Sequence, residues 1–132
     1  RQARRLMQVT ENALLNAILQ AQPGKRVHDI SWAVQSYAQE HKLSVIRDYT
    51  GHGIGKKLHE EPAVPNVGRA GTGMRLEPGM VIALEPMVTL GTWKTKVQPN
   101  KWTVSTTDGS LSAHFEHTVA VTDDGPLVLT AL

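Results

Sequence analysis

Apolar residues near the start of the chain recur with the spacing of amphipathic helices. In residues 4–22 they stand three or four positions apart, and Pro23-Gly24 follows directly. This spacing predicts a helix over 4–22 that ends at the Pro-Gly pair. The same periodicity predicts a second helix over about 28–41. Neither apolar face carries reactive groups, so we expect both helices to serve as scaffold.

The hydrophobic pattern changes after the second helix. Residues 43–50 predict a strand, whereas 51–79 are rich in glycine and proline and predict irregular structure with turns. The apolar run 80–88, "MVIALEPMV", predicts one strand. Residues 101–125 predict two more, joined around "TDGS" and closed by "DDGP", before the short apolar tail "LVLTAL". Two helices followed by an antiparallel sheet make an α+β fold, and we expect a single domain over 1–132.

Composition narrows the possible functions. The 132 residues suit one domain, and 14 basic against 12 acidic side chains is too small an excess to indicate nucleic-acid binding. The absence of cysteine excludes disulfides, thiolate zinc sites and a cysteine nucleophile, and it fits a reducing compartment. We find no apolar run near ~18 residues and no signal-peptide pattern. We therefore expect a cytoplasmic protein with no membrane and no nucleic-acid partner.

The stretch "GHGIGKKLHEEP", residues 51–62, is the first candidate for chemistry. It places His52 between glycines and His59 before an acidic pair and a proline. Glycine allows a backbone to approach a ligand closely, and histidine is both a common metal ligand and a proton-transfer group near neutral pH. The alternative is a glycine turn with solvated histidines.

Two glutamates interrupt apolar strands. Glu85 stands in "VIALEPMV" and Glu116 in "AHFEHTVAV". A buried, unpaired carboxylate is costly, and two carboxylates in one pocket repel each other. A cation between them would remove both problems, although an edge strand with its glutamate in water is the alternative. One histidine nitrogen and two carboxylates suit Mn, Fe, Co or Zn and leave open coordination positions.

Three segments together resemble a known family. "GHGIGKKLHEEP", "GMVIALEPMV" and "WTVSTTDGSLSAHFEHTVAVT" are similar, in this order, to blocks of the type I methionine aminopeptidases, which have the pita-bread fold. The resemblance implies the C-terminal half of that fold and two divalent metal ions in the complete site. It implies His52, Glu85 and Glu116 as metal ligands, with Glu116 bridging the ions. The family has five protein ligands, and two are aspartates of a first half that is absent here, so we expect partial metal occupancy.

The resemblance also implies a reaction, the removal of the N-terminal methionine from nascent proteins and peptides by metal-activated water. Glu85 would also handle the proton of the nucleophile. His59 would act in catalysis by hydrogen-bonding the scissile peptide, while Trp102 and Leu58 would line the methionine pocket. We expect the isolated half to be weak or inactive.

Two other classes of function stay open. The chain could be a non-catalytic interaction module of the same fold, because its ligand set is incomplete. It could also be half of a proline-type peptidase or a creatinase-like enzyme, which share the glycine-histidine segment. Besides peptide N-termini, the expected partners are the missing first half or a second copy of the chain.

Overall fold

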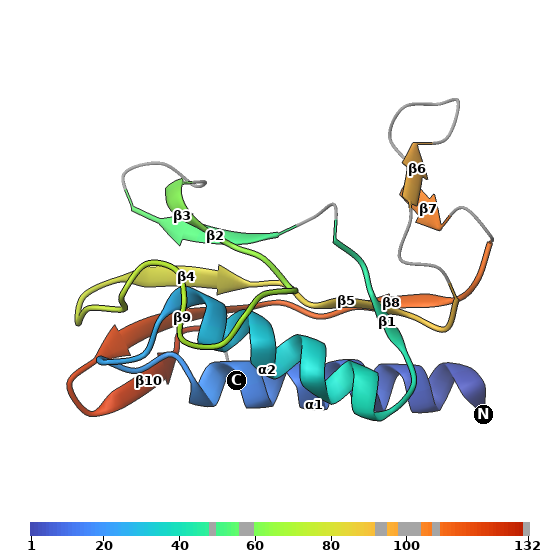
Figure 1. The fold of residues 1–132 in the computed structure, drawn as a ribbon, viewed down its shortest axis with the longest axis horizontal. Coiled ribbons are helices and arrows are strands. Elements are labelled where there is room, and N and C mark those ends of the chain that lie inside the picture. Colours follow the sequence, from blue (N-terminus) through green and yellow to red (C-terminus); the bar gives the residue numbers. More distant parts are fainter. Residues whose placement is uncertain (48–49, 56–59, 92–94, 98–103, 107–108, 131–132) are drawn as a thin grey trace.

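The computed structural model describes residues 1–47, 50–55, 60–91, 95–97, 104–106 and 109–130. Two helices precede a series of short strands (Figure 1). The helices are α1 (Gln2–Leu19) and α2 (Val27–Glu40), and the strands are β1 (Ser44–Val45), β2 (Gly51–Ile54), β3 (Glu60–Val64), β4 (Val81–Leu84), β5 (Met87–Thr89), β6 (Thr95–Val97), β7 (Val104–Thr106), β8 (Ser112–His114), β9 (His117–Thr122) and β10 (Gly125–Val128).

The two helices pack against each other and against one face of the sheet (Figure 1). Their predicted apolar faces are the buried ones, with Leu14 of α1 and Val34 of α2 almost fully enclosed. The first helix ends at Leu19 rather than at residue 22, because Gln20 closes the last turn by donating its N–H to Ala17. Among the described residues, neither helix is long and apolar enough to cross a bilayer.

The strands pair antiparallel throughout the described part of the chain. One sheet has the order β10-β9-β4-β2-β3, a second has β1-β5-β8, and β6 pairs with β7 alone. Both helices lie on the same side of the sheets, whereas the β6–β7 pair rises on the opposite side (Figure 1). The expected α+β order of helices before sheet is confirmed.

The predicted irregular structure of 51–79 was wrong in its first part. This segment contains β2 and β3, and β2 is an inner strand of the five-stranded sheet. The glycines that suggested a turn instead permit close strand packing, as described below. The tail was also misjudged, because its first residues belong to β10, which pairs with β9, and Asp123 and Asp124 form the hairpin turn between them.

The apolar run 80–88 forms two strands, β4 and β5, rather than the single strand predicted. Glu85 and Pro86 separate them, and Pro86 has no N–H to donate to a ladder. On the neighbouring strand, Phe115 and Glu116 separate β8 from β9 in the same way. The two interruptions therefore coincide and divide the strands between two sheets.

These interruptions keep the register of the strands. Leu84 is paired with His117 on one side of the break, and Met87 with His114 on the other. Two residues intervene on each strand, so Glu85 lies opposite Glu116. Side chains alternate between faces: Leu84 belongs to the core under the helices, which leaves Glu85 on the face away from them.

Candidate metal centre

The glycines around His52 bring β2 close to its neighbours. A Cβ atom on Gly51 would overlap the carbonyl oxygen of Ala83, and one on Gly53 would overlap that of Glu61. Only glycine fits such an approach without shifting a strand. The pairing of β2 with β3 also shifts register between His52 and Gly53, and such irregularities re-aim side chains. His52 is thus placed by backbone packing on both sides.

Glu85 and Glu116 reach the same place from the two strand interruptions. His52 is paired with Ala83, two residues before Glu85 and on the same face. Ligand atoms of His52, Glu85 and Glu116 all lie within 4.8 Å of one another. The structure therefore brings together the three residues that the sequence suggested as metal ligands.

The contact between His52 and Glu85 depends on which ring nitrogen carries the hydrogen. His52 Nε2 lies 3.0 Å from Glu85 Oε2, while His52 Nδ1 lies 3.1 Å from the Gly53 carbonyl oxygen. If Nδ1 carries the hydrogen and donates it to that carbonyl, the Nε2 lone pair faces a carboxylate oxygen. A second proton on the ring or a bound cation would reconcile these atoms, and a main-chain carbonyl partner at the other nitrogen is typical of metal-ligating histidines.

The donor set fits a divalent ion. Two ligand atoms about 2.1 Å from one ion and at right angles to each other are about 3 Å apart, which matches the His52–Glu85 contact of 3.0 Å. Glu116 is exposed and Glu85 is partly buried, so one carboxylate can adjust while the other is held. A protonated His52 would explain the Glu85 contact alone but not the approach of Glu116.

His114 is a neighbour that the sequence interpretation did not assign to the site. Its Nε2 lies 3.7 Å from Glu85 Oε1, and its side chain is 42% exposed. The signal was present in the sequence, because His114 precedes Glu116 by two positions and so shares its strand face. Glu85 thus lies between His52 and His114.

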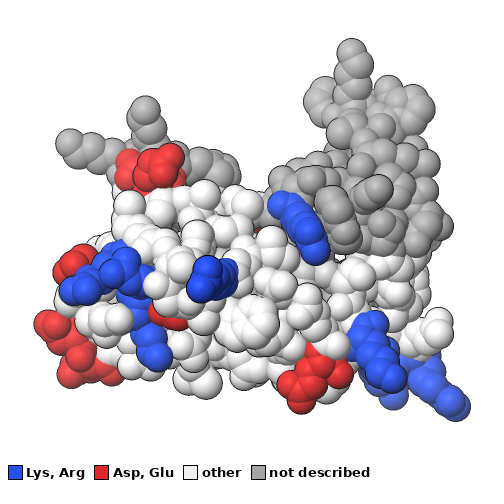
Figure 2. Space-filling model, in the orientation of Figure 1, with Lys and Arg blue, Asp and Glu red and all other residues white. Residues whose placement is uncertain are grey.

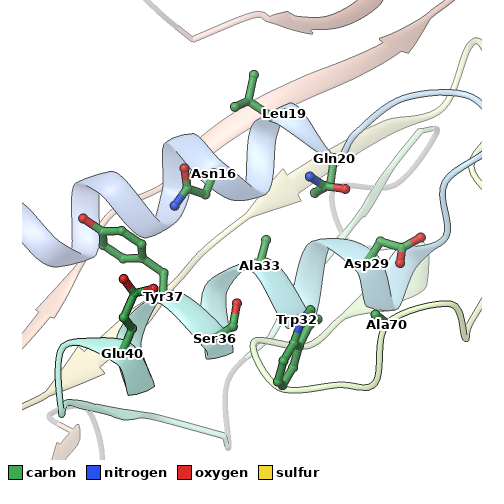
Figure 3. Close-up of a pocket in the computed structure, with 10 residues that line it drawn as sticks. All are labelled: Asn16, Leu19, Gln20, Asp29, Trp32, Ala33, Ser36, Tyr37, Glu40 and Ala70. Carbon is green, nitrogen blue, oxygen red and sulfur yellow. The ribbon is translucent and has the colours of Figure 1, made fainter.

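Leu58, His59 and Trp102 lie outside the described residues, so their expected roles remain predictions. A cavity of about 390 Å³ lies on the helix side and includes none of the three converging residues. In Figure 3, Trp32 projects from α2 at this cavity, and Tyr37 reaches toward α1. On the face seen in Figure 2, basic and acidic side chains of the described residues are interspersed, so charge alone marks no binding surface there.

Comparison with known proteins places this geometry in a family. The profile of metallopeptidase family M24 matches residues 1–123. The chain belongs to metallopeptidase family M24. Members of this family are metal-dependent, which agrees with the donor set of the candidate centre.

Within family M24, this chain is similar to several methionine aminopeptidases. It is 50% identical over 129 residues to a methionine aminopeptidase of Clostridium acetobutylicum, covering 98% of this chain and 52% of that protein. The crystal structure of methionine aminopeptidase from Rickettsia prowazekii superposes with a TM-score of 0.95 at 47% identity, covering 98% of this chain and 53% of that one. The expected half of a pita-bread fold is thereby confirmed, and the chain spans about half the length of the curated relatives it matches.

The likeness of this M24 chain to proline-type enzymes shows the fold alone. The prolidase from Pyrococcus furiosus gives a TM-score of 0.75 at 21% identity, covering 100% of this chain and 33% of that one. Identity at this level says nothing of activity.

Proposed function

We propose that this chain is the C-terminal half of a methionine aminopeptidase, and that the complete polypeptide removes N-terminal methionine from peptides and nascent proteins. The observation that carries the proposal is the convergence of His52, Glu85 and Glu116 within 4.8 Å. Identity of about half to methionine aminopeptidases supports this specificity over a proline-type one. The convergence also counts against a non-catalytic interaction module, which would have no need of it.

The three converging residues have distinct roles in the proposed reaction. His52, Glu85 and Glu116 would hold the divalent ions, Co, Mn, Fe or Zn. When bound, such ions supply Lewis acidity that makes water nucleophilic near neutral pH. Glu85 would accept the proton of the attacking water and pass it to the leaving amine, a role worth about 10²–10⁴-fold in rate.

The remaining roles fall on residues of the "GHGIGKKLHEEP" and "KWTV" segments. His59 would donate a hydrogen bond to the scissile peptide and stabilise its developing negative charge, where loss of one donor costs about 10²–10³-fold. Trp102 and Leu58 would form an apolar pocket for the unbranched methionine side chain.

The centre of this chain would be completed by another polypeptide segment. Three ligands are fewer than the five that the family resemblance implies, so we propose that an aspartate-bearing first half covers the open face of the sheet. Self-association of the chain is the alternative, because exposed strand edges favour pairing with another chain. We place the complete protein in the cytoplasm, where nascent chains emerge.

A pair of peptide substrates tests the proposal. With the first half supplied and Co²⁺ or Mn²⁺ added, a Met-Ala-Ser peptide should lose its methionine, whereas an X-Pro peptide should stay intact. His52→Ala should abolish both turnover and metal binding. The matched control is His28→Ala. His28 is also partly buried, but it lies at the start of α2 and its side chain bonds to Thr72. Cleavage of the X-Pro peptide instead, or an unchanged His52→Ala variant, would overturn the assignment.

A further inference from the structure

We infer that Asn66 is a positioning residue that fixes the backbone at Glu85 and thereby sets the place of the Glu85 carboxylate. The Asn66 side chain is buried, with 4% of its surface exposed. Its Nδ2 donates a hydrogen bond to the Glu85 carbonyl oxygen at 3.0 Å. This inference rests on the proposed function, in which Glu85 is a metal ligand.

The Glu85 carbonyl needs such a donor because the strand ladder ends beside it. Met80 accepts a hydrogen bond from Val121 N of β9 at 2.8 Å, and Pro86 accepts one from Phe115 N, between β8 and β9, at 3.2 Å. Successive carbonyls of a strand point in opposite directions, so the carbonyl of Glu85 points to the β2 side. On that side β2 begins at Gly51, and the position opposite Glu85 lies one residue before this start of the strand. The Asn66 amide takes the place of the missing ladder donor.

The segment that follows Asn66 is bonded to α2. Asn66 lies two residues beyond the end of β3, and two main-chain N–H groups after it bond to helix side chains. Gly68 N donates to Gln35 Oε1 at 3.0 Å, and Gly71 N donates to Asp29 Oδ1 at 2.9 Å. These bonds hold the segment, whereas the bond to Glu85 comes from Asn66 itself.

A shift of the backbone at Glu85 would move both carboxylate oxygens. These lie 3.0 Å from His52 and 3.7 Å from His114, and the shorter contact depends most on the position of the carboxylate. Groups that orient a ligand without touching the ion usually change metal affinity by about 10–100-fold. Asn66 should belong to this class, although it contacts the main chain of the ligand rather than its carboxylate.

Metal titration of the complete polypeptide separates this role from a general effect on folding. Asn66→Leu and Asn66→Ala remove the donor, and Gln35→Leu and Gln35→Ala are matched controls because Gln35 anchors the same segment without reaching Glu85. The readouts are the Kd for Co²⁺ by calorimetry, the visible absorption of the bound Co²⁺, and the thermal midpoint without metal. We expect the Asn66 variants to raise the Kd by about 10–100-fold and to alter the absorption, with both Gln35 variants near the wild-type Kd.

The outcomes distinguish this inference from the function on which it rests. If the wild-type protein binds Co²⁺ but the Asn66 variants bind it equally well, only the positioning role is overturned. Equal weakening by the Gln35 variants would also overturn it, because the effect would then belong to the whole segment. If the wild-type protein does not bind Co²⁺, the metal centre itself is refuted. Should the alanine variant fail to fold, the leucine variant, which fills the site, decides.

Discussion

Replacing Glu116 by glutamine should change stability in opposite directions with and without metal. The substitution keeps the shape of the side chain and removes one negative charge. Glu116 is exposed, so little packing is lost. Its carboxylate lies within 4.8 Å of the Glu85 carboxylate, and two such charges repel by about 1 kcal/mol even at the dielectric constant of water. Without metal, the variant should therefore be as stable as the wild type or more stable.

With metal, the same charge would be a ligand under the proposed function, so its loss should weaken binding. At a metal concentration of ~100 times the Kd, binding stabilises the folded protein by about 2.7 kcal/mol. If the variant raises the Kd about 100-fold, the same concentration leaves only about 0.4 kcal/mol. For a complete polypeptide about twice the length of this chain, each kcal/mol corresponds to about 2–4 °C in Tm, so most of the metal-induced rise in Tm should disappear.

Differential scanning fluorimetry of the complete polypeptide, with and without Co²⁺, measures both effects. Glu77→Gln is the matched control, since it removes an equally exposed charge from the turn before β4. A Glu116→Gln variant that is less stable without metal would show that no repulsion exists at the centre. A variant with the full metal-induced rise would show that Glu116 is not a ligand.

Two further predictions concern His59 and Asp29. His59→Ala should lower turnover by about 10²–10³-fold and leave the Kd for Co²⁺ unchanged; loss of metal in that variant would mean that the roles of the two histidines were exchanged. Burial raises the pKa of Asp29, but hydrogen bonds from the main chain of Arg26 and Gly71 and the charges of Lys25 and Arg26 outweigh it, so the net pKa is lowered from 3.8. Stability from this carboxylate should then be present above pH 3.8 and lost as the pH falls through the lower folded value. Acid titration followed by circular dichroism should show a shallower loss below pH 3.8 for Asp29→Asn, and an identical acid transition in the variant would refute this contribution.

The helices and the three converging residues could be predicted from the sequence because each has a local cause. Periodic apolar residues gave both helices to within a few positions, and a charged residue in an apolar strand marked Glu85 and Glu116. The strand boundaries could not be predicted in the same way. Pro86 breaks one strand by its missing N–H, but the break at Phe115 on the other strand depends on which residues the fold places opposite each other.

The glycine segment shows a different limit. Its residues favour a turn when considered alone, and they form β2 only because Ala83 and Glu61 approach them from both sides. The roles of Asn66 and His114 likewise come from neighbours distant in the chain. Pairing between strands depends on residues that are far apart in the sequence, so it cannot be predicted from a short stretch of the chain.

The coincident interruptions also have a mechanical consequence. Along β4–β5 and β8–β9, the two sheets meet at a crease where Pro86 cannot contribute a ladder donor. An ion held by Glu85 and Glu116 would link the two strands at that crease and tie both to β2 through His52. It would act as a short cross-link where both strands are interrupted. The curvature of the sheet at this crease and the affinity for the ion would then be coupled. A change that makes the crease more rigid would also increase metal affinity.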